Sequence, residues 1–178
     1  MICQTPTPSL KFQNSRSCYK LAKKYYKFGQ FTDAIELLSV ILSIHPNCAK
    51  ILSKRGNAYH KLGRYTEALA DYDRVVEIQP NSAQAWNNRT RTLTKLAQYG
   101  SALQSSNRAI ALNPNYAQAW ISRGIILAHC KRYQGAIACF EAALKLDPNL
   151  AAAQLHLESC QRKSSQCTHH NANLVTVE

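Results

Sequence analysis

Acidic residues are scarce in this chain. Among its 178 residues, 10 are Asp or Glu and 22 are Lys or Arg, so the formal net charge at pH 7 is +12. No acid precedes Asp33, and none lies between Glu77 and Glu141. So few carboxylates provide no obvious pair for general acid–base catalysis. Long stretches of one charge favour an anionic partner instead.

The chain also lacks any run of about 18 apolar residues, which a membrane-spanning helix requires. Its first residues, MICQTPTPSLKF, do not combine a basic start with an apolar stretch, so we predict no signal peptide. With neither feature present, we expect a cytoplasmic location.

Signatures of catalysis and of metal binding are missing as well. The sequence has no glycine-rich phosphate loop, and its six histidines are scattered rather than placed in a Ser/His/Asp or Cys/His arrangement. Its seven cysteines include no CxxC pair, and their odd number indicates reduced thiols that pack as apolar side chains. Cys160, Cys167, His169 and His170 lie close in sequence, but their spacing matches no known zinc pattern. We therefore expect a non-enzymatic protein without a metal or cofactor.

Proline, by contrast, recurs at a fixed interval of 34 residues, and asparagine follows each of these prolines. A fixed period of roughly 20–50 residues indicates a row of repeated supersecondary units. Counting back 31 residues from each proline defines four units without insertions. The prolines are Pro46, Pro80, Pro114 and Pro148, and the units are 15–48, 49–82, 83–116 and 117–150.

Other positions repeat with the same period: the eighth residue of a unit is usually small, the seventeenth is aromatic and the twentieth is alanine. In unit order these residues are Ala22, Gly56, Thr90 and Gly124; Phe31, Tyr65, Tyr99 and Tyr133; and Ala34, Ala68, Ala102 and Ala136. Apolar residues within each unit recur every three or four positions, as in amphipathic helices. Each unit is therefore predicted to be a helix–turn–helix whose small residues let the two helices approach closely.

The turn between the two helices differs among the units. In the second unit Gly63 stands at the turn, where a helix end favours a left-handed residue. Ala97 and Lys131 replace this glycine in the third and fourth units. A non-glycine residue in that conformation costs about 1 kcal/mol. We therefore expect looser turns in these two units. Thr90, which is bulkier than glycine, is a further departure from the repeat pattern.

These positions and the 34-residue period resemble the tetratricopeptide repeat (TPR) family over residues 15–150. The resemblance implies an all-α fold, a right-handed superhelix (α-solenoid) of four TPR helical hairpins. The first helix of each hairpin is expected to line a concave groove. TPR proteins are interaction scaffolds, so the resemblance also implies a protein or peptide partner.

Beyond the last unit an apolar stripe continues through Leu150, Ala153, Leu157 and Cys160. Glu158 holds the place that is small in the units, so no second helix is expected to pack there. We predict a single capping helix at 151–163, because repeat arrays need a polar-backed end. The flanking segments, 1–14 and 164–178, show no periodicity and are predicted to be disordered tails.

The resemblance assigns six positions of each first helix to the groove, and nine of the residues at these positions are cationic while none is acidic. The predicted groove is cationic and aromatic in the first unit and becomes neutral and apolar in the fourth. We predict that it binds an acidic peptide. The predicted contact residues are Tyr19, Lys20, Lys23, Lys27, Lys54, Asn57, His60, Lys61, Asn88, Arg91, Lys95, Ile121 and Ile125.

Two other ligands are compatible with the sequence. Some TPR domains clamp the carboxylate of acidic chaperone tails with two asparagines and three basic residues. Asn57 and Asn88 match those asparagines, but the basic positions hold residues that cannot supply the charge, namely Ser53, Gln118 and Ser122. RNA or another nucleic acid is the alternative for the basic groove, with an affinity that falls steeply with salt. No known RNA-reading motif is present.

Arginine recurs at one further position, the seventh of units two to four, as Arg55, Arg89 and Arg123. We expect Arg55 to pair with Asp71 while its aliphatic stem packs against the neighbouring helix. The next two units have Ser105 and Cys139 in place of that acid. For Arg89 and Arg123, a structural role and a role in contacting an anionic ligand therefore both stay open.

Overall fold

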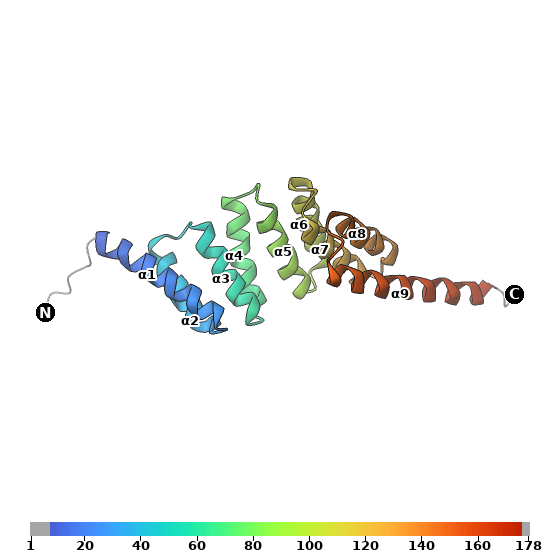
Figure 1. Cartoon of the computed structure of the whole chain (residues 1–178), viewed down its shortest axis with the longest axis horizontal. Coiled ribbons are helices and arrows are strands. Elements are labelled where there is room, and N and C mark those ends of the chain that lie inside the picture. The colour runs from blue at the N-terminus through green and yellow to red at the C-terminus, as the bar shows by residue number, and fades with distance from the viewer. Residues whose placement is uncertain (1–7, 176–178) are drawn as a thin grey trace. The chain divides into compact units, whose positions relative to one another are not determined.

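A computed structural model of the chain describes residues 8–175, and within them the side chains of residues 15–166. In this described part the chain forms nine α-helices and no strand, which confirms the predicted all-α helical-repeat fold. The helices belong to two compact units, one that ends at Pro80 and one that begins at Asn81. The first and second unit are these two, and each 34-residue segment is called a repeat. Figure 1 draws the first unit in blue to green and the second in yellow-green to red. None of the described helices is long and apolar enough to cross a membrane.

The first unit contains two helical hairpins. In one hairpin α1 (Pro8–Lys27) packs against α2 (Phe31–Ile44), and in the other α3 (Ala49–Lys61) packs against α4 (Tyr65–Ile78). Helix α2 also packs against α3, so the two hairpins share one core. Helices α1 and α3 are thus the first helices of their hairpins.

The second unit contains two further hairpins and a final helix. Helix α5 (Ala83–Lys95) packs against α6 (Tyr99–Leu112), and α7 (Ala117–His129) packs against α8 (Tyr133–Leu146). Helix α9 (Ala151–Val175) packs against α8 and also touches α7. The hydrophobic core of this end of the unit draws residues from α7, α8 and α9.

Helix α9 covers the last hairpin as a capping helix does, because its Ala153 and Cys160 are buried in that core. It also extends past residue 163, into the segment predicted to be a disordered tail. There the side-chain amide of Gln134 on α8 donates a hydrogen bond to Ser164 Oγ at 2.8 Å, which ties the extension to the hairpin.

At the other end of the chain, α1 begins at Pro8 rather than at the predicted boundary of residue 15. The structure therefore places helix over 8–14 and 164–175, where tails were predicted. The remainder of those two segments, 1–7 and 176–178, lies outside the described residues.

The two helices of a hairpin approach each other where residues eight and twenty-four of the repeat meet. A Cβ atom added to Gly56 would lie 3.1 Å from the ring of Tyr72, and one added to Gly124 would lie 2.7 Å from the ring of Phe140. In the third repeat both positions are buried and of similar size, Thr90 and Ser106. The bulkier Thr90 is thus accommodated, because a small residue, Ser106, replaces the ring that faces glycine in the second and fourth repeats.

The expectation of looser turns in the third and fourth repeats is wrong. Ala97 and Lys131 adopt φ angles of 57° and 59°, the same left-handed region as Gly29 and Gly63 in the first unit. Their turns keep the same hydrogen bonds, for example from Gln98 N to Leu93 O at 2.9 Å. Because these bonds satisfy the last carbonyls of the helix, they offset the backbone strain of a non-glycine residue.

Candidate functional site

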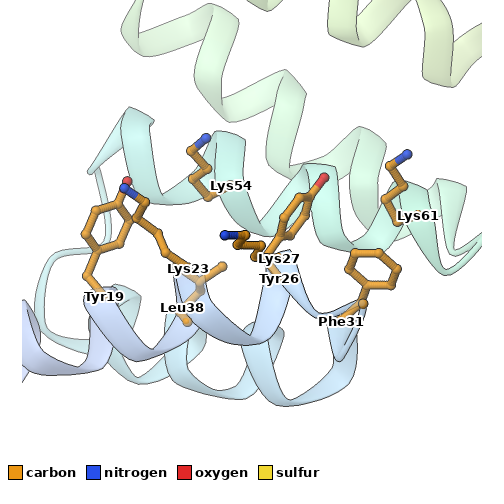
Figure 2. A pocket seen from close by; sticks show the side chains of 10 residues that line it. Tyr19, Lys23, Tyr26, Lys27, Phe31, Leu38, Lys54 and Lys61 are labelled. Carbon is orange, nitrogen blue, oxygen red and sulfur yellow. The ribbon is translucent and has the colours of Figure 1, made fainter.

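A pocket with a volume of about 500 Å³ lies in the first unit. Helices α1, α2 and α3 and the turn between α1 and α2 supply its walls. In Figure 2 the side chains extend from Tyr19 and Lys23 at one end to Phe31 and Lys61 at the other. The lining residues are Tyr19, Ala22, Lys23, Tyr26, Lys27, Gly29, Phe31, Leu38, Lys54 and Lys61.

The floor of this pocket is apolar. Ala22 and Leu38 are each only 2 % exposed and belong to the core of the unit. Phe31 begins α2, and its ring packs edge-to-face against Tyr26 with the ring centroids 5.2 Å apart. A ligand that reaches the floor therefore meets hydrocarbon and aromatic surface rather than polar groups.

Four lysines stand above the floor, and all four are exposed. Lys23 and Lys27 lie on α1, and Lys54 and Lys61 lie on α3. Helices α1 and α3 contain no acidic residue, and all six acids of the first unit lie on α2 and α4. We refer to these four residues as the lysine rim.

The acids of the unit do not neutralise the lysine rim. Two ion pairs of the first unit join Arg55 with Asp71 and Arg64 with Glu67. The hydrogen bond from Arg64 lowers the pKa of the Glu67 carboxyl, so that acid stays ionised beside its arginine. Neither pair includes a rim lysine. The rim therefore presents uncompensated positive charge, and an anionic ligand is attracted to it.

Of the predicted groove residues, the structure brings five together in the pocket, namely Tyr19, Lys23, Lys27, Lys54 and Lys61. Three others of the first unit lie outside the lining. Lys20 is exposed on α1. Asn57 accepts a hydrogen bond of 2.7 Å from the hydroxyl of Tyr72. The ring of His60 packs edge-to-face against that of Tyr65 at 5.1 Å.

The predicted residues of the second unit divide into two groups. Asn88, Arg91 and Lys95 lie on α5, where the first is half-buried and the other two are exposed. Ile121 is only 6 % exposed and belongs to the core, and Ile125 packs partly buried against it. Ile121 therefore contributes to the fold, because this face of α7 packs against α8 and α9. A role of Ile121 and Ile125 in binding a ligand stays a prediction.

The predicted list omitted the apolar part of the pocket. Ala22 and Phe31 hold positions that repeat in every unit, and this repetition indicates helix packing alone. Leu38 holds the variable twenty-fourth position, which gives no periodic signal. Tyr26 belongs to the groove-facing positions and was the omitted residue that the pattern could have supplied. A packing residue also becomes part of a site where the neighbouring side chains leave its edge uncovered.

The three repeating arginines meet three different partners. Arg55 donates two hydrogen bonds to Asp71, at 2.9 and 2.7 Å, which raise the pKa of the guanidinium, and a third to Ser39 at 3.0 Å. Arg89 donates to Ser105 Oγ at 2.5 Å. These contacts confirm the predicted Arg55–Asp71 pair, and they show that a hydroxyl replaces the acid one repeat later.

In the fourth repeat this contact is weaker still. Arg123 Nη1 lies 3.5 Å from the sulfur of Cys139, a poor acceptor. Its Nε is buried and forms no hydrogen bond with the described residues. Burial raises the pKa of the Cys139 thiol, although the nearby Arg123 lowers it in part. The thiol therefore stays neutral at pH 7 and does not replace the carboxylate of Asp71.

Comparison with known families gives one consistent result. Four tetratricopeptide repeat models match the chain, over residues 19–47, 49–82, 71–104 and 91–158. The matched segments include the lysine rim and all of α3 to α8. No curated protein matches the sequence.

Solved structures with the same fold include three of particular interest. A crystal structure of MamA protein is 22% identical, with a TM-score of 0.77, covering 86% of this chain and 84% of that chain. The Sgt2 TPR domain from Aspergillus fumigatus is 24% identical, with a TM-score of 0.66 and coverages of 68% and 82%. The first TPR of Spaghetti (RPAP3), bound to the HSP90 peptide SRMEEVD, is 28% identical, with a TM-score of 0.64 and coverages of 66% and 93%.

Proposed function

Because the chain belongs to the tetratricopeptide repeat family and is a protein-interaction repeat module, we propose that its first unit binds an acidic peptide in the pocket of α1, α2 and α3. The observation that carries this proposal is the lysine rim. Four exposed lysines without an acidic partner surround an apolar floor of suitable size for a few side chains. Such a site binds a ligand through charge at its edge and apolar contact at its base.

The structure of the RPAP3 domain supports an acidic ligand, since the peptide it holds, SRMEEVD, contains three acidic residues. The pocket of this chain does not reproduce the chaperone-tail clamp described above. Of the positions that supply charge in that clamp, Ser122 is buried and Ser53 is half-buried. We therefore propose that this pocket binds acidic side chains rather than a terminal carboxylate.

The proposed role is binding without catalysis. The rim lysines raise the local concentration of an anionic segment and speed its association, an effect that weakens as salt screens the charges. Burial of an apolar side chain on the floor slows dissociation. The cytoplasmic location and the groove roles of Asn88, Arg91 and Lys95 stay predictions.

Charge reversal in the pocket tests the proposal. The probe is a blocked peptide, EVEVE, compared with its neutral analogue QVQVQ by calorimetric titration of the whole chain at constant ionic strength. We expect EVEVE to bind and QVQVQ to bind much more weakly. Replacing Lys23→Glu together with Lys54→Glu should weaken EVEVE binding by at least about tenfold, because both reversals repel the acids.

Lys24 and Lys145 provide a matched control, since both are exposed lysines that do not line the pocket. The Lys24→Glu/Lys145→Glu variant changes the net charge as much as the Lys23/Lys54 variant does, and it should bind EVEVE within about twofold of the unchanged chain, because screened charges outside the site matter little. Equal losses in the two double variants would reduce the effect to net charge and overturn the proposal. Circular dichroism checks that each variant is folded.

Nucleic acid is the competing ligand for a basic surface. A single-stranded RNA oligonucleotide should bind weakly at physiological salt if the pocket is built for acidic side chains on an apolar floor. If RNA instead bound more tightly than EVEVE, and lost affinity in the Lys23/Lys54 variant, the site would be assigned to nucleic acid and the peptide proposal abandoned.

A further inference from the structure

We infer that the peptide for this pocket is an extended segment in which acidic and apolar residues alternate, an inference that rests on the proposed function. The two features that determine it are the spacing of the rim lysines and the chemistry of the floor. Neither feature follows from net charge alone, which any acidic sequence would satisfy.

The spacing along α1 sets the distance between acids. Lys23 and Lys27 are four residues apart, which corresponds to about 6 Å of rise along a helix. Two residues of an extended chain span about 6.6 Å. A peptide that lies along α1 therefore presents acids to both lysines when the acids are two residues apart.

The opposite wall covers the same stretch. Lys54 and Lys61 on α3 are seven residues apart, or about 10 Å of helix rise. Figure 2 shows Lys54 beside the Tyr19 end and Lys61 beside Phe31. A short extended segment that runs from one end of the pocket to the other therefore has cations along both sides.

The floor determines the residues between the acids. Side chains of an extended chain point alternately to opposite faces, so the residue between two acids points away from them. When the acids reach up to the rim, that residue reaches down to Ala22, Phe31 and Leu38, which are all apolar. An aliphatic side chain fits there, whereas a polar one would lose its water without gaining a partner.

Three blocked peptides test this inference on the whole chain by calorimetric titration. EVEVE alternates, VEEEV has the same composition with its acids in one block, and ESESE keeps the acidic spacing without apolar residues. We expect EVEVE to bind at least about tenfold more tightly than each of the other two. Raising the salt should weaken EVEVE and ESESE alike, so that the ratio between them is preserved.

The outcomes separate the two proposals. Equal affinities of all three peptides, each weakened by the Lys23→Glu/Lys54→Glu change, would overturn the alternation and leave the binding of acidic peptides intact. No measurable binding of any of the three would overturn both. Tighter binding of VEEEV than of EVEVE would also reject the extended alternating ligand.

A milder pair of variants sharpens the result from the side of the protein. Lys27→Gln removes the second cation of the α1 pair, whereas Lys24→Gln removes a charge outside the pocket. The preference for EVEVE over VEEEV should shrink by at least about threefold in the Lys27 variant and stay unchanged in the Lys24 variant. An unchanged preference in both variants would mean that the spacing along α1 does not select the ligand.

Discussion

The two units of this chain are built from the same repeat, but they differ in the residues at the place where the first unit has its pocket. In the first unit Phe31 and Lys61 flank the pocket, and the lysine stays exposed. The residues at the equivalent positions of the second unit, Tyr99 and His129, stack on each other with ring centroids 5.5 Å apart. A cation that leaves an aromatic edge open is thus replaced by a ring that covers it. The two units therefore differ at this place in whether a lysine or a ring stands beside the aromatic residue.

The same contrast appears inside the hairpins. The first unit has glycine in its turns and an ion pair of Arg55 with Asp71 at the edge of its core, whereas the second has Ala97 and Lys131 in its turns, and its Arg89 and Arg123 contact Ser105 and Cys139. The backbone is the same in each case. Repeating positions therefore fix the path of the chain, and the local stability depends on the residues that break the repeat.

The largest difference between the units should come from the buried pair. Asp71 is almost fully buried, and its removal in Asp71→Ala leaves Arg55 partly buried without its acid. We expect a loss of about 3 kcal/mol in the free energy of unfolding. Urea unfolding followed by circular dichroism measures it.

The matched change in the second unit is Ser105→Ala, which removes the hydroxyl that accepts from Arg89. It should cost about 1.5 kcal/mol, the lower end of the range for one hydrogen bond to a charged group, because Arg89 is only half-buried. Similar losses for Asp71→Ala and Ser105→Ala would show that the acid adds nothing to this contact.

Close packing should separate the units next. A methyl group at residue 124 would lie 2.7 Å from the fully buried ring of Phe140, so the ring would have to shift. Gly124→Ala should therefore destabilise the chain by about 2 kcal/mol through overpacking. Gly56→Ala meets Tyr72 at 3.1 Å and should have a smaller effect. The reverse order in urea unfolding would contradict the assigned contacts.

The pocket itself can be changed towards the second unit. Lys61→His places in the first unit the residue type that stacks on Tyr99 in the second, so it should cover Phe31 and remove one rim charge. We expect EVEVE binding to weaken about tenfold, or about 1.4 kcal/mol. Lys61→Gln removes the charge alone and should weaken binding less, and equal effects of the two variants would exclude the stacking.

The turns should give a smaller effect of opposite sign in the two units. Ala97→Gly and Lys131→Gly remove the strain of a positive φ and should each stabilise the chain by about 1 kcal/mol. Gly29→Ala and Gly63→Ala introduce that strain and should each destabilise it by a similar amount. A Cβ at either glycine would contact nothing within 4 Å, so crowding does not contribute. If the sign were the same in both units, strain would not be the cause.

The sequence predicted the hairpins well because their determinants are local and periodic. Alanine at the twentieth position is fully buried in all four repeats, and the Arg55–Asp71 pair followed from complementary charges on the two helices of one repeat. The burial of Ile121 was not predicted, because a groove-facing position becomes part of the core when neighbouring helices cover it. That information depends in part on α9, which lies outside the repeat of Ile121.

The pocket was predictable only in its charged half. Lysines at groove-facing positions indicate cations directly, and four of those predicted line the pocket. Phe31 and Leu38 line the pocket because Lys61 stands where the second unit has a ring, and the lysine leaves them uncovered. Exposure of a packing residue is set by its neighbours in space, and the periodic pattern averages these differences away.

The smallest expected effect concerns Arg123, the repeating arginine that has no acidic partner among the described residues. Arg123 makes one weak contact, with Cys139, and its Nε is buried without a hydrogen bond among the described residues. Arg123→Met keeps the aliphatic packing of the stem and removes a charge that is costly to desolvate, so stability should change by less than about 0.5 kcal/mol or increase. Arg55→Met, by contrast, should destabilise the chain clearly, because it leaves Asp71 buried and unpaired. If both variants lost stability equally in urea unfolding, Arg123 would have a partner equivalent to Asp71, and the two units would not differ at this position.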